Sequence, residues 1–405
     1  METLRFVFTT TFYPPYHLGG DAVHVKYLAE ELAKNGHEVH VLHSLDAFRL
    51  KNGAFQEEVE HGGVQTHLLR TPFCTSPYAA YFFGNSSFVT RRFKDLVDKV
   101  KPDIVHHHNI SLLGYNILKK QREYMNIYTS HDSWLVCQQN LFLKNGKEPC
   151  QSYTCFSCSV RCGRPPQIWR YRRAFDQAIK ELDLLIAPSS FLGDRIREKI
   201  CLKTVTIPNF VPEPPHEIGQ SSFSNYFLYA GVLEKHKGIL DLVNVFKDLE
   251  TDSKLLIAGN GSLKTKIEEF TKTNNLTGKI VLLGWVDHIF LCQLLKNANA
   301  LLVPSVCPEN SPMIVLEALS VGTPVIASKK GGLPEILNKV DSNLLFSNLS
   351  EFKNLLSGFS RDEYSSSKIR SVYRRYFSPE AYIGKYTEAI AQLRVVSQSS
   401  ARCSS

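Results

Sequence analysis

The sequence has no apolar run long enough to cross a bilayer as a helix. Hydrophobic residues make up 43% and charged residues 21% of the 405 residues, as in ordinary globular proteins. No segment reaches the roughly 18 consecutive apolar residues that a spanning helix requires. The first eight residues enter a strand-like run and lack the charged, apolar and small-residue order of a secretory signal. We therefore expect a cytosolic protein.

A strong charge imbalance is also missing. The net charge of +8 attracts anionic substrates and lipid headgroups in general. No nucleic-acid-binding motif accompanies that charge, so we expect no nucleic-acid partner.

Cysteines are few outside one stretch, which argues against a secreted disulfide scaffold. Half of the 10 cysteines lie between Cys137 and Cys162. Cys155 and Cys158 have metal-ligand spacing, and with Cys150 and Cys162 they offer four thiolates for a structural zinc. Reduced thiols and disulfides are the alternatives, and the sequence leaves all three open.

Strand-length apolar runs alternate with helical patterns, which predicts parallel sheets with crossover helices. The alternation breaks at residues 209–225, a stretch rich in proline followed by polar residues that is typical of a linker. We predict an α/β fold with two Rossmann-like domains, at 1–208 and 226–378, and a C-terminal helix at 379–395. The cysteine-rich segment is an insertion near 137–162 in the first domain.

A glycine turn in the second domain is a candidate phosphate site. Gly259 and Gly261 follow an expected strand and precede an expected helix, where backbone N–H groups can approach a phosphate. Lys237 adds a cation that could neutralise a diphosphate. A tight turn and a surface lysine are the alternatives.

Glu309 and Glu317 form the strongest segment. They are eight residues apart, after a strand and within a helix that begins near Pro312. Carboxylates can hold the hydroxyls of a ribose or a sugar, and the N–H groups of Met313 and Ile314 would point at a phosphate. An ordinary helix start with two solvated acids is the alternative.

These residues resemble the Glu-x7-Glu signature of family 4 glycosyltransferases, which are retaining enzymes of the GT-B fold. Further family marks follow in order over nearly the whole chain: Gly19-Gly20, His131-Asp132, Gly231 to Gly238, the run 322–327, and the run 331–335. The resemblance implies a sugar transfer from a nucleotide diphosphate donor, UDP- or GDP-linked, in the cleft between two facing domains. It implies no metal or other cofactor for catalysis.

The resemblance also implies residue roles. Glu309 would contact the ring hydroxyls of the transferred sugar, and Glu317 the nucleotide ribose. Lys237 would hold the diphosphate, Gly20 would let a loop of the first domain come close to it, and His131 would contact the sugar near its reacting carbon. The acceptor would be a glycan or lipid-linked glycan of a cell-surface polysaccharide pathway.

One position departs from the family pattern. Val232 stands where family members usually carry an arginine, so a second diphosphate cation is missing from its usual place. A catalytically weakened donor-binding subunit is therefore one alternative to a transferase, and a two-lobed sugar-nucleotide epimerase is another.

Two further stretches combine aromatic and basic residues. Five arginines lie between Arg161 and Arg173 beside Trp169 and Tyr171, and an aromatic run from Tyr78 precedes Arg91-Arg92. Such stretches suit peripheral contact with an anionic membrane, here the inner face of the plasma membrane. A solvated helix face with part of the core is the alternative. Three adjacent histidines, 106–108, cannot converge on one ion from a regular strand, because neighbouring side chains alternate faces.

Overall fold

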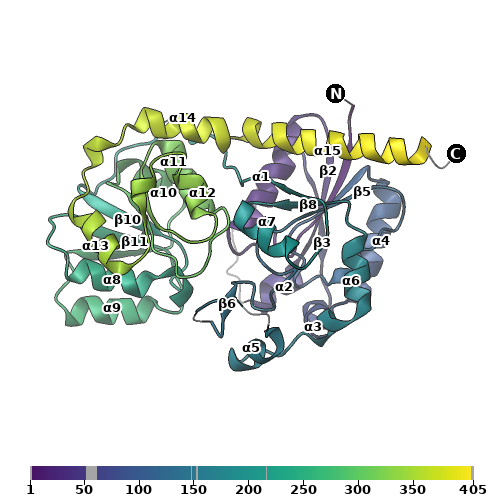
Figure 1. Ribbon diagram of the computed structural model, residues 1–405, viewed down its shortest axis with the longest axis horizontal. Coiled ribbons are helices and arrows are strands. Elements are labelled where there is room, and N and C mark those ends of the chain that lie inside the picture. Colours follow the sequence, from purple (N-terminus) through teal and green to yellow (C-terminus); the bar gives the residue numbers. More distant parts are fainter. Residues whose placement is uncertain (1, 52–61, 147, 152–153, 216, 403–405) are drawn as a thin grey trace. The chain divides into compact units, whose positions relative to one another are not determined.

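The chain folds into two compact units in the computed structural model, which describes residues 2–51, 62–146, 148–151, 154–215 and 217–402 (Figure 1). Unit 1 comprises residues 1–207 together with 384–405, and unit 2 comprises residues 208–383. None of the described helices is both long and apolar enough to span a membrane.

Unit 1 contains a parallel sheet in the order β3-β2-β1-β4-β5-β8-β9. Its strands are β1 (Arg5–Thr9), β2 (Glu38–Ser44), β3 (Gln65–Leu69), β4 (Ile104–His107), β5 (Met125–Thr129), β8 (Leu184–Ala187) and β9 (Thr204–Thr206). The crossover helices are α1 (Gly20–Lys34), α2 (Leu45–Leu50), α3 (Thr75–Phe83), α4 (Ser87–Val100), η1 (Tyr115–Leu118), α6 (Arg173–Lys180) and α7 (Ser190–Arg197). The order reverses between β1 and β4, as in doubly wound folds.

The cysteine-rich segment forms an excursion between β5 and α6. It consists of a two-stranded hairpin and two short helices: β6 (Leu143–Lys144), β7 (Glu148–Pro149), α5 (Cys155–Arg161) and η2 (Ile168–Tyr171). The insertion predicted near 137–162 lies within this excursion, which extends to η2, where Trp169 is buried in the main core of unit 1.

Unit 2 repeats the doubly wound plan in the order β12-β11-β10-β13-β14-β15. Its strands are β10 (Tyr226–Ala230), β11 (Lys254–Ala258), β12 (Ile280–Gly284), β13 (Leu301–Val303), β14 (Val325–Ser328) and β15 (Leu345–Phe346). Its helices are η3 (Lys235–Lys237), α8 (Ile239–Lys247), α9 (Lys264–Thr273), α10 (His288–Asn297), α11 (Met313–Val321), α12 (Leu333–Leu337), η4 (Ser342–Leu344), α13 (Leu349–Ser357), η5 (Arg361–Glu363) and α14 (Ser366–Tyr376). Helices α8, α9 and α13 lie on one side of the sheet, and α10 and α11 on the other (Figure 1).

The first residues of the predicted linker 209–225 are packed against other parts of unit 2. Asn209 donates from its backbone N–H to Ser311 Oγ at 3.1 Å and from Nδ2 to the Ser311 carbonyl at 2.9 Å. Phe210 is buried with its ring 4.7 Å from that of Tyr382. The first residues of this stretch therefore belong to the core of unit 2.

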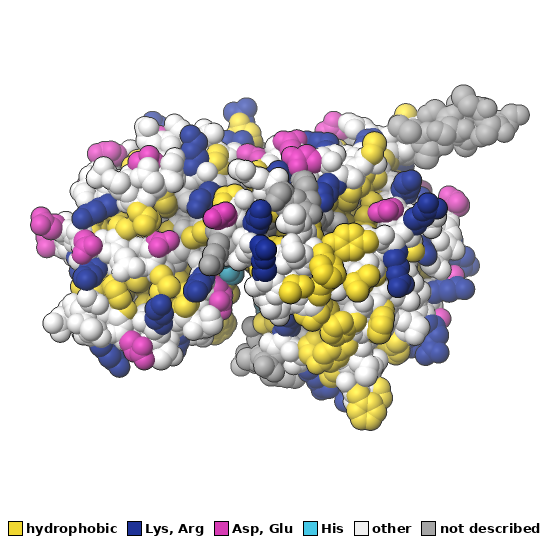
Figure 2. All heavy atoms as spheres, turned by 60° about the horizontal axis from the view of Figure 1, so that its bottom comes forward, with side chains coloured by type: hydrophobic (Ala, Val, Ile, Leu, Met, Phe, Trp, Pro, Cys, Tyr) yellow, Lys and Arg dark blue, Asp and Glu magenta, His cyan; other side chains and the backbone are white. Residues whose placement is uncertain are grey.

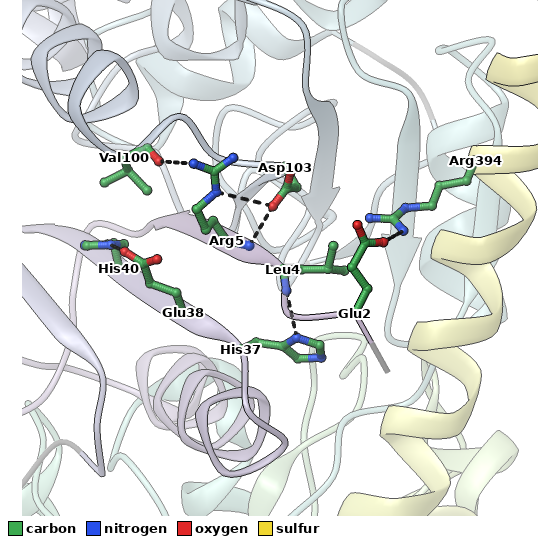
Figure 3. Close-up of polar contacts among 9 residues, drawn as sticks. All are labelled: Glu2, Leu4, Arg5, His37, Glu38, His40, Val100, Asp103 and Arg394. Atoms are coloured by element: carbon green, nitrogen blue, oxygen red, sulfur yellow. Dashed lines mark hydrogen bonds and ion pairs between the residues drawn. The ribbon is translucent and has the colours of Figure 1, made fainter.

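The C-terminal helix α15 (Pro379–Arg402) starts in unit 2 and enters unit 1 at Gly384. Within unit 1, Arg394 Nη1 donates to Glu2 Oε2 at 3.2 Å (Figure 3). At the same edge, Asp103 Oδ2 accepts from the Arg5 backbone N–H at 2.8 Å. The contact of Arg394 with Glu2 attaches the helix to the amino-terminal edge of the first sheet.

A group of buried histidines lies beside the carboxyl ends of β4 and β5. His106 of β4 and His108, the residue after the strand, have ring centroids 4.1 Å apart, whereas the His107 ring contacts Phe93. His106 Nε2 pairs with Thr129 Oγ1 at 2.8 Å, and His107 Nδ1 pairs with Thr9 Oγ1 at 2.7 Å. Burial lowers the pKa of His107 to about 3 and that of His131 to about 4.

We predict that unit 1 loses stability as the pH falls from 6.5 towards 4. In this pH range the histidines bind protons in the unfolded chain but stay neutral in the folded one. Each imidazole whose pKa is lowered from 6.5 to about 4 on folding therefore reduces the free energy of unfolding by about 2 kcal/mol at pH 5. The thermal midpoint should be followed by the fluorescence of Trp134 and Trp169, which are buried in unit 1.

One carboxyl group acts in the opposite direction, because burial raises the pKa of Asp132 to about 7. The fully buried histidines of this unit whose pKa is lowered outnumber it: His24, His106, His107, His108 and His131. The pKa values of His17, His37 and His67 are lowered as well. Between pH 7 and 8 these imidazoles are largely neutral in both states and Asp132 is the group that titrates, so that interval is the control, in which the midpoint should not rise with pH. A midpoint that does not change between pH 7 and 5 contradicts the prediction.

Candidate functional site

The strand order of unit 2 reverses between β10 and β13, and the loops after these strands carry the candidate residues. In open α/β sheets this position lies outside the carboxyl ends of the strands and is where ligands bind. Here η3 and Lys237 follow β10, whereas Ser305 and Glu309 follow β13.

The two loops are held together by backbone contacts. The carbonyl of His236 accepts from the N–H groups of Val306 at 2.9 Å and Cys307 at 3.1 Å. Gly238 has φ of +71°, and a Cβ atom there would lie 1.9 Å from the Pro304 carbonyl oxygen. Only glycine fits this approach, which sets the position of the neighbouring Lys237.

Lys237 and Glu309 form an ion pair. Lys237 Nζ lies 2.7 Å from Glu309 Oε1, and Ser305 Oγ donates to the same oxygen at 2.6 Å. Burial by itself would raise the pKa of Glu309, but the Lys237 charge and these two hydrogen bonds hold it below its usual value. Burial would lower the pKa of Lys237, and Glu309 raises it. Both side chains are therefore charged at neutral pH.

The backbone of Glu309 is fixed from a third loop. Glu309 forms a parallel bridge with Gly331, and its carbonyl accepts from the Gly332 N–H at 2.6 Å. A Cβ atom on Gly331 would lie 2.1 Å from the Glu309 carbonyl oxygen. The glycine pair after β14 thus keeps Glu309 at the edge of the sheet.

Gly259 and Gly261 lie against the loop after β10. A Cβ atom on Gly259 would lie 1.9 Å from the Gly231 carbonyl oxygen, and one on Gly261 would lie 2.5 Å from that of Leu233. Helix α9 begins only at Lys264. These glycines are therefore required first by close backbone packing beside the site.

Helix α11 directs its first turn at the same edge. Pro312 is its N-cap residue, and Met313 and Ile314 are its first two residues, so their N–H groups have no partner within the helix. Glu317 follows on the next turn, with Oε1 3.7 Å from His288 Nε2. Burial raises the pKa of Glu317 to about 7.

Val232 is 48% exposed. Its carbonyl accepts from the Tyr229 hydroxyl at 2.9 Å, which fixes the backbone at the position of the usual arginine. The exposed side chain shows that a longer residue has room to extend there.

Gly20 and His131 belong to unit 1. Gly20 is the first residue of α1, after Gly19 with φ of +85°. His131 Nε2 pairs with His108 Nδ1 at 3.0 Å. Asp21 is bonded by Asn109 Nδ2 at 2.8 Å and raises the pKa of His131 against the larger effect of burial. Gly20, Asp21 and His131 therefore share the carboxyl edge of the first sheet.

Two family models cover most of the chain. The model for glycosyl transferases group 1 matches residues 215–370, and the model for glycosyltransferase family 4 matches residues 18–213. The chain belongs to glycosyltransferase family 4. An uncharacterized glycosyltransferase of Methanocaldococcus jannaschii is 28% identical over 347 residues, which cover 82% of this chain and 83% of the relative.

Solved structures establish the GT-B fold of this glycosyltransferase. Sucrose-phosphate synthase from Thermosynechococcus elongatus superposes with a TM-score of 0.74 at 19% identity, covering 97% of this chain and 100% of that one. HepE from Anabaena, solved with UDP and glucose, gives a TM-score of 0.65 at 14% identity, covering 96% and 100%.

The zinc hypothesis gains no support from the structure. Cys150, Cys155 and Cys158 line a small cavity together with Cys137, whereas Cys162 is outside that lining. Among the residues that the structure describes, no three His, Cys, Asp or Glu side chains are arranged so that they could hold a metal ion. The structure thus provides no ligand set from the four predicted thiols.

Sequence reasoning missed the groups that orient the candidates. Ser305 bonds the Glu309 carboxylate, and the His236 carbonyl anchors the loop of Lys237. His108 bonds the ring of His131. The position of Ser305 directly after an expected strand was the one available signal, since the other two contacts depend on tertiary packing.

We predict that Gly259→Ala destabilises unit 2 by about 2 kcal/mol or more and abolishes nucleotide binding, because the added Cβ collides with backbone. Gly278→Ala is the matched control, since a Cβ there meets nothing within 4 Å. Thermal unfolding and calorimetric titration with UDP measure the two effects. Equal stability of the two variants contradicts the packing argument.

Proposed function

We propose that this glycosyltransferase moves a sugar from a nucleoside diphosphate donor to an acceptor hydroxyl with retention of the anomeric configuration. The ion pair of Lys237 with Glu309, 2.7 Å apart at the strand reversal of unit 2, carries the proposal. A cation and an acid held side by side at that edge suit a substrate with a diphosphate next to a polyhydroxylated ring.

In the proposed mechanism the donor competes for the ion pair. Lys237 moves its charge from Glu309 to the diphosphate, and Glu309 accepts hydrogen bonds from the sugar hydroxyls. The N–H groups of Met313 and Ile314 face the same diphosphate. These donors stabilise the negative charge that builds on the leaving group as its bond to the anomeric carbon breaks. The acceptor oxygen forms the new bond to the anomeric carbon on the face that the diphosphate leaves, and the diphosphate takes the proton of the acceptor hydroxyl.

Gly20 and His131 are the proposed contributions of unit 1. Gly20 offers the N-terminus of α1 and a backbone without a side chain, which suits close approach to a phosphate. The neutral ring of His131, held by His108, suits a hydrogen bond to the sugar near its reacting carbon.

For the donor we propose a UDP-sugar, with a GDP-sugar as the alternative. The support is the structural neighbour solved with UDP and glucose. For the acceptor we propose a glycan or a lipid-linked glycan of a surface polysaccharide pathway, used at the inner face of the plasma membrane.

We predict that UDP binds without magnesium and more weakly as the pH falls below 7. Ionised Glu317 accepts the ribose hydroxyls, and its pKa of about 7 means that acid neutralises it. Affinity should fall by up to about tenfold per pH unit below that pKa. Glu317→Gln should lower affinity at pH 8 by about tenfold or more and remove the pH dependence. Calorimetric titration from pH 5.5 to 8 measures both.

Glu250→Gln, which alters an exposed acid of unit 2, is the matched control and should bind as the wild type does. GDP and ADP titrated in parallel identify the base. If Glu317→Gln binds UDP unchanged, the ribose assignment is wrong, and if no nucleotide binds, the donor proposal fails.

We further predict that Val232→Arg raises donor affinity and transfer rate by roughly tenfold, because a charge-assisted hydrogen bond to the diphosphate is added at an exposed position. Val232→Gln, with similar length and no charge, is the control. Transfer is followed by release of UDP, and NMR of the product reports the anomeric configuration. Equal gains from both variants would show that the added charge is irrelevant.

A further inference from the structure

Large hydrophobic side chains gather in the open on one face of unit 1. Most of those that the structure leaves exposed in this unit come from two stretches, 73–83 and 156–171. They are Phe73 (85% exposed), Tyr78 (50%), Phe82 (49%), Phe83 (72%), Phe156 (53%), Val160 (56%), Ile168 (60%) and Tyr171 (61%). Figure 2 shows a broad hydrophobic area on one face of this unit. We call these eight residues the aromatic face.

The two stretches are joined by direct contacts. Trp169 Nε1 donates to the Tyr81 carbonyl at 2.9 Å, and the Tyr81 hydroxyl donates to the Pro165 carbonyl at 3.1 Å. The Gln138 side chain ties α5 to η2, because its Oε1 accepts from Ser159 Oγ at 2.9 Å and from the Gln167 N–H at 3.0 Å. The aromatic face is therefore one built surface.

The partly buried side chain of Arg170 anchors the surface from within. Its guanidinium carbon lies 4.7 Å from the ring centroids of both Trp134 and Trp169, and Nη1 donates to the Trp134 carbonyl at 2.6 Å. Burial lowers its pKa to about 10. This inner packing holds η2 in place while Ile168 and Tyr171 point outwards.

The sequence stretches that form the aromatic face carry charges of one sign. The sequence contains no Asp or Glu from residue 62 to 94 or from residue 149 to 175. Arg91, Arg92, Arg161 and Arg164 in these stretches are exposed. Lys and Arg side chains lie beside the hydrophobic area in Figure 2. A surface of this composition attracts a partner that is apolar within and anionic at its boundary.

These features discriminate among partners. A second copy of the same face would set like charges against each other. Two of the eight exposed residues, Val160 and Ile168, are aliphatic, and such side chains suit acyl chains but give bases no stacking surface. Contiguous exposed apolar area of this kind marks an interaction site.

We infer that the aromatic face docks on an anionic lipid bilayer, with its rings at the boundary of headgroups and acyl chains and its arginines on the phosphates. The cysteine-rich excursion thereby has a role, since α5 and η2 supply half of the surface. The docking does not depend on the donor site of unit 2, so the two can fail separately.

Vesicle flotation tests this inference with the full chain. The wild type should float with vesicles of phosphatidylcholine and phosphatidylglycerol and remain behind with phosphatidylcholine alone. Phe73→Ser/Phe83→Ser should weaken binding about tenfold or more, because two large apolar side chains leave the interface. Arg161→Gln/Arg164→Gln should weaken it about 30-fold at low salt. High salt should oppose binding of the wild type.

Matched variants of unit 2 are the controls. Leu349→Ser removes an exposed apolar side chain, and Lys266→Gln/Lys272→Gln removes exposed charges from α9. Both should float as the wild type does. Thermal unfolding and UDP titration show that every variant is folded and separate a lost membrane contact from a lost donor site.

Three results overturn the inference. The first is a wild type that does not float with anionic vesicles, and the second is flotation that both test variants retain. The third is a dimer in sedimentation that Phe73→Ser/Phe83→Ser converts to monomer, because a second copy would then cover the aromatic face.

Discussion

Every strand of the two large sheets runs parallel to its neighbours, and this constraint decides where chemistry can occur. Parallel strands end at a common edge, so loops that are far apart in sequence meet there. In unit 2 the loops pack so closely that a Cβ atom added to any of three glycines, at 238, 259 and 331, would lie only 1.9 to 2.1 Å from a backbone carbonyl oxygen. The ion pair of Lys237 and Glu309 depends on that close packing.

The fold could be predicted from the sequence because the hydrophobic periodicity and the turn residues indicate the same strands and helices along the chain. Alternating apolar runs predicted the strands to within a few residues, and the two doubly wound sheets confirm the GT-B assignment. Short β15 and the packed start of the 209–225 stretch were missed. Their structure comes from tertiary contacts, such as Asn209 with Ser311, that no local pattern records.

The candidate site was accessible in part for a similar reason. Glu309, Glu317 and Lys237 are charged residues at a spacing that resembles a family signature, so the sequence alone identifies them as candidates. The groups that orient them are a serine hydroxyl, a backbone carbonyl and glycines without side chains. The contacts of such groups form only after the loops pack against each other. The roles of Ser305 and His236 were therefore found from the structure and not from the sequence pattern. The cysteine spacing was visible in the sequence and suggested a zinc site. Among the described residues, however, the side chains are not arranged so that they could hold a metal ion.

Helix α15 gives the chain an unusual order of completion. Unit 2 is a continuous stretch set inside unit 1, whose last part begins at Gly384. The Tyr386 hydroxyl meets His106 Nδ1 at 2.9 Å across a sequence separation of 280 residues. During synthesis on the ribosome, unit 1 therefore cannot bind its last segment, the end of α15, until the whole of unit 2 has emerged. The later-made unit can reach its native structure first, and the earlier-made one is the last to close.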